Sequence, residues 1–204
     1  MTPLPFIPNI RLKPEVTAFF DELTNTVTYV VKDPLSNSCA IVDSVMDIDY
    51  AAGRISYDSA DHVIDHVQRN ALMVEWHIET HVHADHLSAA PYLQKKLGGK
   101  IGIGRNITIV QETFGKIFNE GTEFQRDGSQ FDKLFDDGDA YNIGTMTAHA
   151  IHTPGHTPAC MTHVVGDAAF GNEPASILVA PHLAQLHVER AGPAVADGGL
   201  GVAE

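Results

Sequence analysis

The sequence predicts an α/β protein, because β-rich runs alternate along the chain with segments of helical periodicity. Three β-rich runs separated by turn residues open the chain, at 16–20, 27–31 and 39–43, and we expect them to form an antiparallel meander. After them, apolar residues recur with helical spacing between further strand-like runs. With 204 residues, 44% of them hydrophobic, the chain can bury a sizeable core in one domain.

The first predicted helix covers residues 59–68. Its apolar residues recur at positions i, i+3, i+4 and i+7, namely Ala60, Val63, Ile64 and Val67. The helix leads into a buried strand at 71–77, and a loop joins this strand to a second helix at 88–97. We expect Gly98 and Gly99 to end that helix. Beyond it we expect a short strand, a helix, an exposed loop and a strand, at 100–104, 107–118, 121–130 and 145–151.

The loop between the strand at 71–77 and the helix at 88–97 holds a cluster of metal-ligand residues. Three imidazoles and one carboxylate lie within six residues, namely His81, His83, Asp85 and His86. In an extended stretch side chains alternate with period 2, so His81 and His83 point to the same side and can converge on one cation. Asp85 and His86 follow on a turn and can face a second position. This spacing favours a metal site over a loop that is rich in histidine by accident.

A second histidine cluster follows the strand at 145–151. His152 and His156 flank a Pro-Gly turn that can aim His156 toward His81. By itself this is weak evidence, because a histidine beside such a turn is commonly a surface residue. The first loop supplies only part of a coordination sphere, however, so a third nitrogen is expected from elsewhere. We choose His156 over His152, whose side chain precedes the turn.

Composition argues against several classes of partner. A net charge of −13 disfavours nucleic acid and anionic membranes, and no apolar run approaches membrane-spanning length. The N-terminus is broken by prolines and has no positive charge before Arg11, so it does not predict a secretory signal. Cys39 and Cys160, each in a strand-like run, predict no disulfide framework. We therefore expect a cytoplasmic protein, and leave homo-oligomer formation open.

Three stretches of the sequence resemble one known family. They are Thr80-His-Val-His-Ala-Asp-His-Leu-Ser-Ala-Ala90, Phe114-Gly-Lys-Ile-Phe118 and Ala150-Ile-His-Thr-Pro-Gly-His-Thr-Pro-Ala-Cys-Met161. They are similar to proteins of the metallo-β-lactamase superfamily, in particular its persulfide dioxygenase-like branch and the related bacterial β-lactamase-like hydrolases. The resemblance covers about residues 5–170. It implies an αββα four-layer sandwich, here incomplete at the C-terminus, with the metal at one edge between the sheets.

The resemblance implies that O2 oxidises a glutathione persulfide, or a similar thiol-derived compound, at one non-haem Fe(II). His81 and His156 would be its histidine ligands, with His83, Asp85 and His86 around the iron as hydrogen-bonding groups. In zinc hydrolases of the superfamily, such as glyoxalase II and β-lactamases, these residues bind one or two Zn(II) directly. Asp85, our candidate catalytic residue, and His86 would then serve the second ion, whose bound hydroxide attacks a thioester, ester or lactam.

The carboxylate ligand is where the sequence departs from the family. The family has an aspartate after the strand that follows the Pro-Gly-His loop, and the matching residue here is Glu173, whose extra methylene would disturb a preorganised site. Asp167 is the other candidate. The run 164–169 predicts a hairpin with Gly166 and Asp167 at its turn, which places Asp167 away from the metal loop.

We expect one metallo-β-lactamase-like domain over residues 1–173 and an atypical tail, disordered or truncated, over 174–204. The tail contains no Phe, Tyr or Trp, and its His182 and His187 lack the family's surrounding residues. Three functions stay open: an iron persulfide dioxygenase, a zinc hydrolase, and an inactive truncated metal-binding homologue. Residue types cannot choose the metal, because imidazole and carboxylate suit both iron and zinc.

Overall fold

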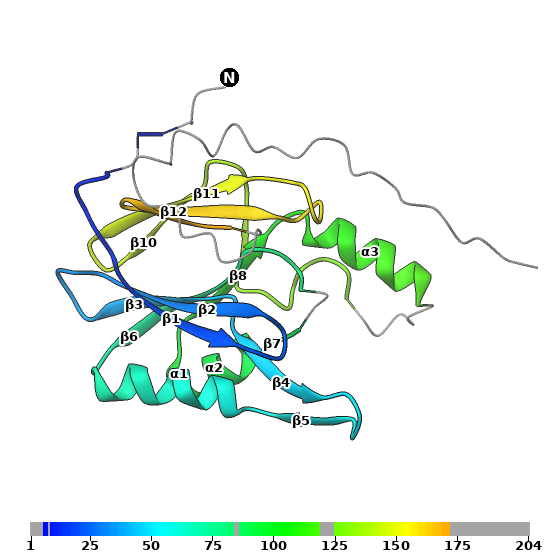
Figure 1. Ribbon diagram of the computed structural model, residues 1–204. Helices are drawn as coiled ribbons and strands as arrows, with labels where there is room; N and C mark the ends of the chain where they lie inside the picture. Colours follow the sequence, from blue (N-terminus) through cyan, green and yellow to red (C-terminus); the bar gives the residue numbers. More distant parts are fainter. Residues whose placement is uncertain (1–5, 8, 84–85, 119–124, 172–204) are drawn as a thin grey trace, which may run out of the picture.

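A computed structural model shows two β-sheets packed face to face, with helices on the outer face of the larger sheet (Figure 1). The structure describes residues 6–7, 9–83, 86–118 and 125–171. The larger sheet contains β1 (Glu15–Asp21), β2 (Thr26–Lys32), β3 (Ser38–Val42), β6 (Met73–Glu79), β8 (Lys100–Gly104) and β9 (Lys133–Phe135), in that spatial order. The smaller sheet contains β10 (Ala140–Ile143), β11 (Met146–His152), β12 (Met161–Val165) and β13 (Ala168–Phe170).

The larger sheet changes from antiparallel to parallel pairing at β3. The meander expected from the first three β-rich runs is confirmed, because β1, β2 and β3 pair antiparallel. From there on, β3 pairs with β6, β6 with β8 and β8 with β9, all in parallel. Parallel neighbours end at the same edge of a sheet, which is where ligand sites of open α/β sheets lie. The loops that follow β3, β6 and β8 therefore meet at one edge.

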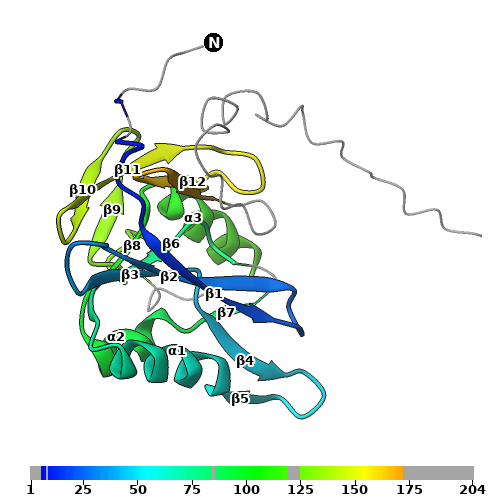
Figure 2. The same cartoon turned by 60° about the vertical axis from the view of Figure 1, so that its left-hand side comes forward.

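A short three-stranded sheet holds the end of the loop that carries the first histidine cluster. Its strands are β5 (Arg54–Ser56), β4 (Val45–Asp49) and β7 (Leu87–Ser88), in that spatial order, and it extends beside the larger sheet (Figure 2). Val45 and Met46 of β4 pair antiparallel with Ser88 and Leu87 of β7. Since β3 also pairs with β6, the segments after β3 and after β6 are held together on both sides.

Helices α1 (Asp58–Arg69) and α2 (Ala90–Leu97) cover the outer face of the larger sheet, while α3 (Ile107–Ile117) lies at its edge (Figure 1). All four apolar residues predicted for α1 are buried. Helix α2 begins two residues later than expected, because Ser88 belongs to β7 and its hydroxyl accepts a hydrogen bond from the Ala90 N–H. The helices have 12, 8 and 11 residues, so no helix in the described part of the chain could cross a membrane.

The main core lies between the two sheets. It is formed by alternate residues of both inner faces, including Val31, Ile78, Phe135, Met146 and Phe170. Burying one such side chain fully contributes about 1.5–3 kcal/mol, so this interface is what holds the two sheets together.

The outer face of the smaller sheet packs against the chain segment that precedes β1. Phe6 packs there against Ile151, Val164 and Ala169, and no helix covers this face within the residues that the structure describes. The described layers are therefore helix, sheet and sheet. The predicted tail at 174–204 lies outside the described residues, as do residues 121–124 of the predicted loop at 121–130.

One cysteine is not where the sequence suggested. Cys39 lies in β3 as expected, but Cys160 precedes β12 and belongs to a loop. Its Sγ atom accepts a hydrogen bond from the Thr157 N–H at 3.1 Å, which closes a turn. Both cysteines are free, in agreement with the absence of a disulfide framework.

Candidate metal centre

The first histidine cluster is compact, although it does not lie in an extended strand as the sequence suggested. β6 ends at Glu79, and the residues after it are irregular. The ring centroids of His81 and His83 lie 4.1 Å apart, and those of His83 and His86 also lie 4.1 Å apart. The three imidazoles therefore form one compact group at the carboxyl edge of the larger sheet.

A carboxylate that sequence reasoning missed joins this group. Asp43 offers an oxygen that lies, with one ring nitrogen each of His81 and His83, within a set whose atoms are all within 4.8 Å of one another. Asp43 directly follows β3 and has a φ of 51°, a left-handed conformation that aspartate tolerates better than most residues. Its backbone N–H continues the parallel pairing by donating to the Ile78 carbonyl. The sequence feature that could have identified Asp43 is a polar residue directly after a strand in which every residue is buried.

Thr80 links this carboxylate to His81. The Thr80 N–H donates to Asp43 Oδ1 and the Thr80 hydroxyl to Asp43 Oδ2, both at 2.8 Å, while Thr80 Oγ1 lies 2.9 Å from His81 Nδ1. A carboxylate only accepts, so the single hydroxyl proton goes to Asp43 and Thr80 Oγ1 accepts from His81 Nδ1–H. This arrangement leaves the free lone pair of His81 on Nε2. Metal-binding histidines commonly have this form, in which one ring nitrogen binds the metal and the other donates a hydrogen bond to the protein.

His83 is held by two carboxylates. Its Nε2 donates to Glu79 Oε2 at 2.9 Å and lies 3.2 Å from Asp43 Oδ1. Burial by itself lowers the pKa of His83, but hydrogen bonds and charges from Asp43 and Glu79 raise it to about 10. Burial likewise raises the pKa of Asp43, and the hydrogen bond and charge of His83 bring it below its usual value. Glu79, a second residue that sequence reasoning missed, also accepts a hydrogen bond from Ser88.

The chemistry of this cluster fits a metal ion. His83 Nδ1 and His86 Nε2 are buried and have no hydrogen-bond partner among the described residues. Buried polar atoms normally have a partner, so two such nitrogens in one cluster point to a ligand that both could bind. Imidazole nitrogen and carboxylate oxygen are also the donors that zinc and non-haem iron take.

The second loop, residues 153–160, brings His156 beside His81. The two ring centroids lie 5.4 Å apart with the planes nearly perpendicular, at 85°. The base of this loop is tied to the first, because the Met161 N–H donates to the Thr80 carbonyl at 2.8 Å. His152 lies elsewhere, with its Nε2 2.8 Å from the Pro158 carbonyl. The structure therefore places His156 in the cluster, and its role as a ligand stays a prediction.

Two predicted site residues, Asp85 and Glu173, lie outside the described residues, so their roles also stay predictions. Asp167, which the sequence argued against, lies at the turn between β12 and β13 as expected. Its backbone N–H donates to the Leu12 carbonyl, and its carboxylate lies 3.9 Å from Lys13 Nζ.

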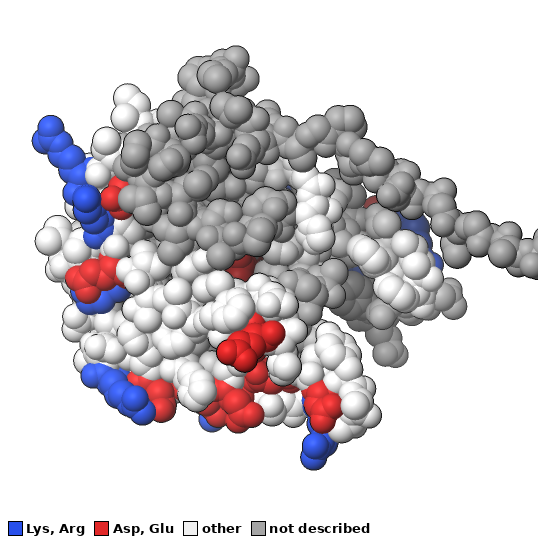
Figure 3. Space-filling view, in the orientation of Figure 1, with Lys and Arg blue, Asp and Glu red and all other residues white. Residues whose placement is uncertain are grey.

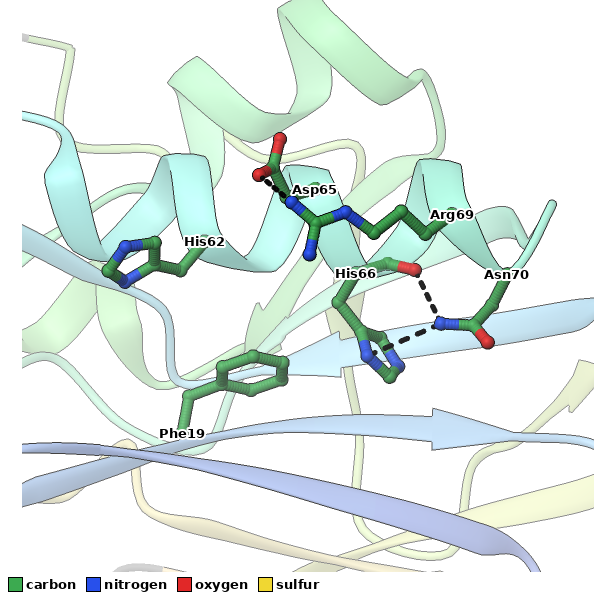
Figure 4. A pocket seen from close by; sticks show the side chains of 6 residues that line it. All are labelled: Phe19, His62, Asp65, His66, Arg69 and Asn70. Carbon is green, nitrogen blue, oxygen red and sulfur yellow. Dashed lines mark hydrogen bonds and ion pairs between the residues drawn. The ribbon is translucent and has the colours of Figure 1, made fainter.

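A surface groove between α1 and β1 contains two further histidines, but it does not belong to this cluster (Figure 4). It is lined by Phe19, His62, Asp65, His66, Arg69 and Asn70. The last of these residues lie where α1 leads into the start of β6, whereas the metal cluster follows the end of β6. The length of β6 separates the two ends by about 20 Å.

A two-sheet α/β fold with clustered histidines at its carboxyl edge defines a class of metal-binding proteins. Residues 22–172, which are more than half of the chain, match the family described as the metallo-beta-lactamase superfamily. The chain belongs to this superfamily, whose members are metal-dependent hydrolases and oxygenases.

The curated relatives are longer proteins. A probable metallo-hydrolase of Burkholderia pseudomallei (strain 1710b) is 54% identical over 75% of this chain and 52% of the relative. Glyoxylase B2 of Dictyostelium discoideum is 41% identical over 78% of this chain and 55% of the relative. The human mitochondrial persulfide dioxygenase ETHE1 is 24% identical over 72% of this chain and 46% of the relative. The chain thus spans about half the length of these proteins, and the relative named as a persulfide dioxygenase is more distant than the other two.

A solved structure confirms the fold. The crystal structure of ETHE1 from Myxococcus xanthus covers 76% of this chain and 56% of that chain, with a TM-score of 0.59 and 21% sequence identity. At this identity the likeness supports the fold alone.

Proposed function

We propose that this protein is a metal-dependent enzyme that uses O2 to oxidise a glutathione persulfide, or a similar thiol-derived compound, at one non-haem iron. His81, His156 and one carboxylate, with Glu173 as the candidate, would hold the iron. The observation that carries the proposal is that His81 and His83 have different neighbours. His83 Nε2 is hydrogen-bonded to Glu79 and lies 3.2 Å from Asp43. The ring of His81, in contrast, lies beside the ring of His156.

This arrangement suits an iron oxygenase. Such an enzyme needs two histidines and one carboxylate on one face of the metal, with other positions open. Thr80 presents His81 in the form that binds metal through Nε2, and the Met161–Thr80 hydrogen bond joins the loops of His81 and His156. Bound iron would supply adjacent positions for a sulfur atom and O2, which makes their reaction intramolecular.

The surface is compatible with a small substrate. On the face seen in Figure 3, acidic and basic side chains are interspersed among neutral ones, and the described residues form no continuous basic surface there. This agrees with the net charge of −13, which disfavours nucleic acid. The cytoplasmic location, the glutathione moiety and the oligomeric state stay predictions.

A zinc hydrolase is the second candidate, and a specific observation favours it. His86 Nε2 is buried without a partner among the described residues, next to His83, as expected if both bind metal directly. The more similar relatives are also named as a metallo-hydrolase and a glyoxylase. In this reading Asp85 and His86 would serve a second zinc, and the substrate would be a thioester, ester or lactam.

One experiment separates these candidates. Protein loaded with iron is tested for O2 uptake on addition of glutathione persulfide, and protein loaded with zinc for hydrolysis of a thioester and a chromogenic β-lactam. His81→Ala, loaded in the same way, controls for metal bound elsewhere. We expect O2 uptake by the parent alone. Thioester turnover with zinc and no O2 uptake with iron would establish the hydrolase, and stoichiometric metal binding without turnover in either form would indicate the inactive homologue.

A further inference from the structure

We propose that Asn106 and His152 are positioning residues that hold the loop of His156 in the place where it can reach the metal. The inference rests on the proposed function in one respect, since it takes His156 to be a ligand. Neither residue touches the histidine cluster directly. They act on Pro158, two residues beyond His156 in the same loop.

The first observation concerns the start of α3. Asn106 is the N-cap residue of this helix, a position at which asparagine is favoured because its side chain accepts a hydrogen bond from the first turn. Here the side chain makes no such bond. Its Nδ2 instead donates to the Pro158 carbonyl at 3.1 Å. A stabilising capping contact is thus replaced by a contact to the loop of His156.

The second observation is that His152 binds the same carbonyl. Its Nε2 lies 2.8 Å from Pro158 O and 3.1 Å from Asn106 Nδ2. A carbonyl oxygen only accepts, so the shorter of these contacts has the proton on Nε2, which donates to Pro158 O. The backbone N–H of His152 donates to Asp137 Oδ1 at 2.8 Å, which fixes the end of β11. A carbonyl has two lone pairs, so Pro158 O can accept from Asn106 and His152 together.

These contacts matter because His156 is itself exposed. The base of its loop is closed by a hydrogen bond from the Thr153 N–H to the Cys160 carbonyl at 3.0 Å. The hydrogen bonds to the Pro158 carbonyl hold the part of the loop that lies between this base and the Pro-Gly turn.

Helix α3 also supports both metal loops through packing. Ile107 and Val110 belong to one apolar cluster with Ala159 of the second loop and Val82 of the first. The first turn of α3 therefore lies against both loops. Through Asn106 it would set the distance between His156 and His81.

The test compares two substitutions at one position. Asn106→Ala removes the contact to Pro158, and Asn106→Ser also removes it but restores a good N-cap, because serine caps helices well and is too short to reach Pro158. If Asn106 positions the loop, both variants raise the dissociation constant for Zn²⁺ by about 10-fold or more, the range for residues that orient metal ligands. The probe is Zn²⁺ in competition with a chromophoric chelator, and thermal unfolding of metal-free protein reports on helix stability. We expect His152→Phe, which keeps the ring and loses the donor, to act in the same direction.

Controls keep the inference separate from the proposed function. Asn70→Ala removes an asparagine at the end of α1 that donates to the His66 carbonyl at 2.8 Å, remote from the metal cluster, and should leave affinity unchanged. His156→Ala tests the ligand assignment, and parental affinity in that variant would refute the assignment itself. If His156→Ala weakens binding but both Asn106 variants bind as the parent does, the positioning role is wrong.

Discussion

The two loops of the metal centre are held in different ways. In the first loop the imidazoles themselves are held: His81 is bonded to Thr80 and His83 to Glu79, and all these side chains are largely buried. In the second loop the side chain of His156 is exposed, and the loop is held through other groups, among them the Pro158 carbonyl. The imidazoles of the first loop are therefore oriented before a metal binds, whereas the position of His156 depends on where the backbone of the second loop is held.

The largest expected effect comes from removing a ligand of the first loop. His81→Ala should abolish stoichiometric metal binding, because it removes a nitrogen that Thr80 has already oriented, while most of the secondary structure remains. Metal content after desalting and far-ultraviolet circular dichroism would check this. His156→Ala should have the same outcome, and a variant of either residue that keeps full metal content would remove that residue from the site.

The next effect concerns the hydroxyl that orients His81. Thr80→Val keeps the shape of the side chain but cannot accept from His81 Nδ1–H, so Zn²⁺ affinity should fall by about 10–100-fold. Thr80→Ser keeps the hydroxyl and should bind Zn²⁺ nearly as well as the parent. Equal affinities for the valine and serine variants would show that the Asp43–Thr80–His81 connection does not prepare the ligand.

A pH dependence is expected in the sheet that carries the second loop. His163 lies on β12 directly after that loop, and its Nδ1 lies 3.0 Å from the Tyr141 hydroxyl. Burial lowers the pKa of His163 to about 4. A depressed pKa means that this contribution is present above the unfolded value of about 6.5 and is lost as pH falls from there toward 4. The parent should lose about 2 kcal/mol of unfolding free energy between pH 7 and 5 from this group.

Urea unfolding of metal-free protein at several pH values measures that loss. His163→Phe removes the titrating group and leaves the other histidines, so the difference between the two profiles isolates His163. Profiles that run parallel between pH 7 and 5 would contradict the assignment.

The smallest expected effect concerns the carboxylate. If Glu173 completes the site, Glu173→Asp should tighten iron binding a few-fold by restoring the shorter arm of the family's aspartate, and Glu173→Ala should weaken it. Iron titration of the three proteins checks this. Equal affinities would exclude Glu173 as a ligand and leave Asp43 and Glu79 as the carboxylates that contact the histidine cluster among the described residues.

Local periodicity and spacing made much of the fold readable from the sequence. Helix α1 follows from its four apolar residues at helical spacing, and all four are buried. The closeness of His81 and His83 agrees with their spacing in one loop. The superfamily follows from the histidine motifs, and the match over residues 22–172 confirms it.

Only the tertiary structure decided which residues hold those histidines. Asp43 is separated from Thr80 by 37 positions and meets it because β3 pairs with β6 in parallel, a long-range pairing that local patterns do not encode. Asn106 and Pro158 are 52 positions apart and meet because α3 packs beside the second loop. Sequence spacing thus determined the candidate ligands, whereas strand pairing and helix packing determined the hydrogen bonds that orient them, since those contacts form only between distant parts of the folded chain.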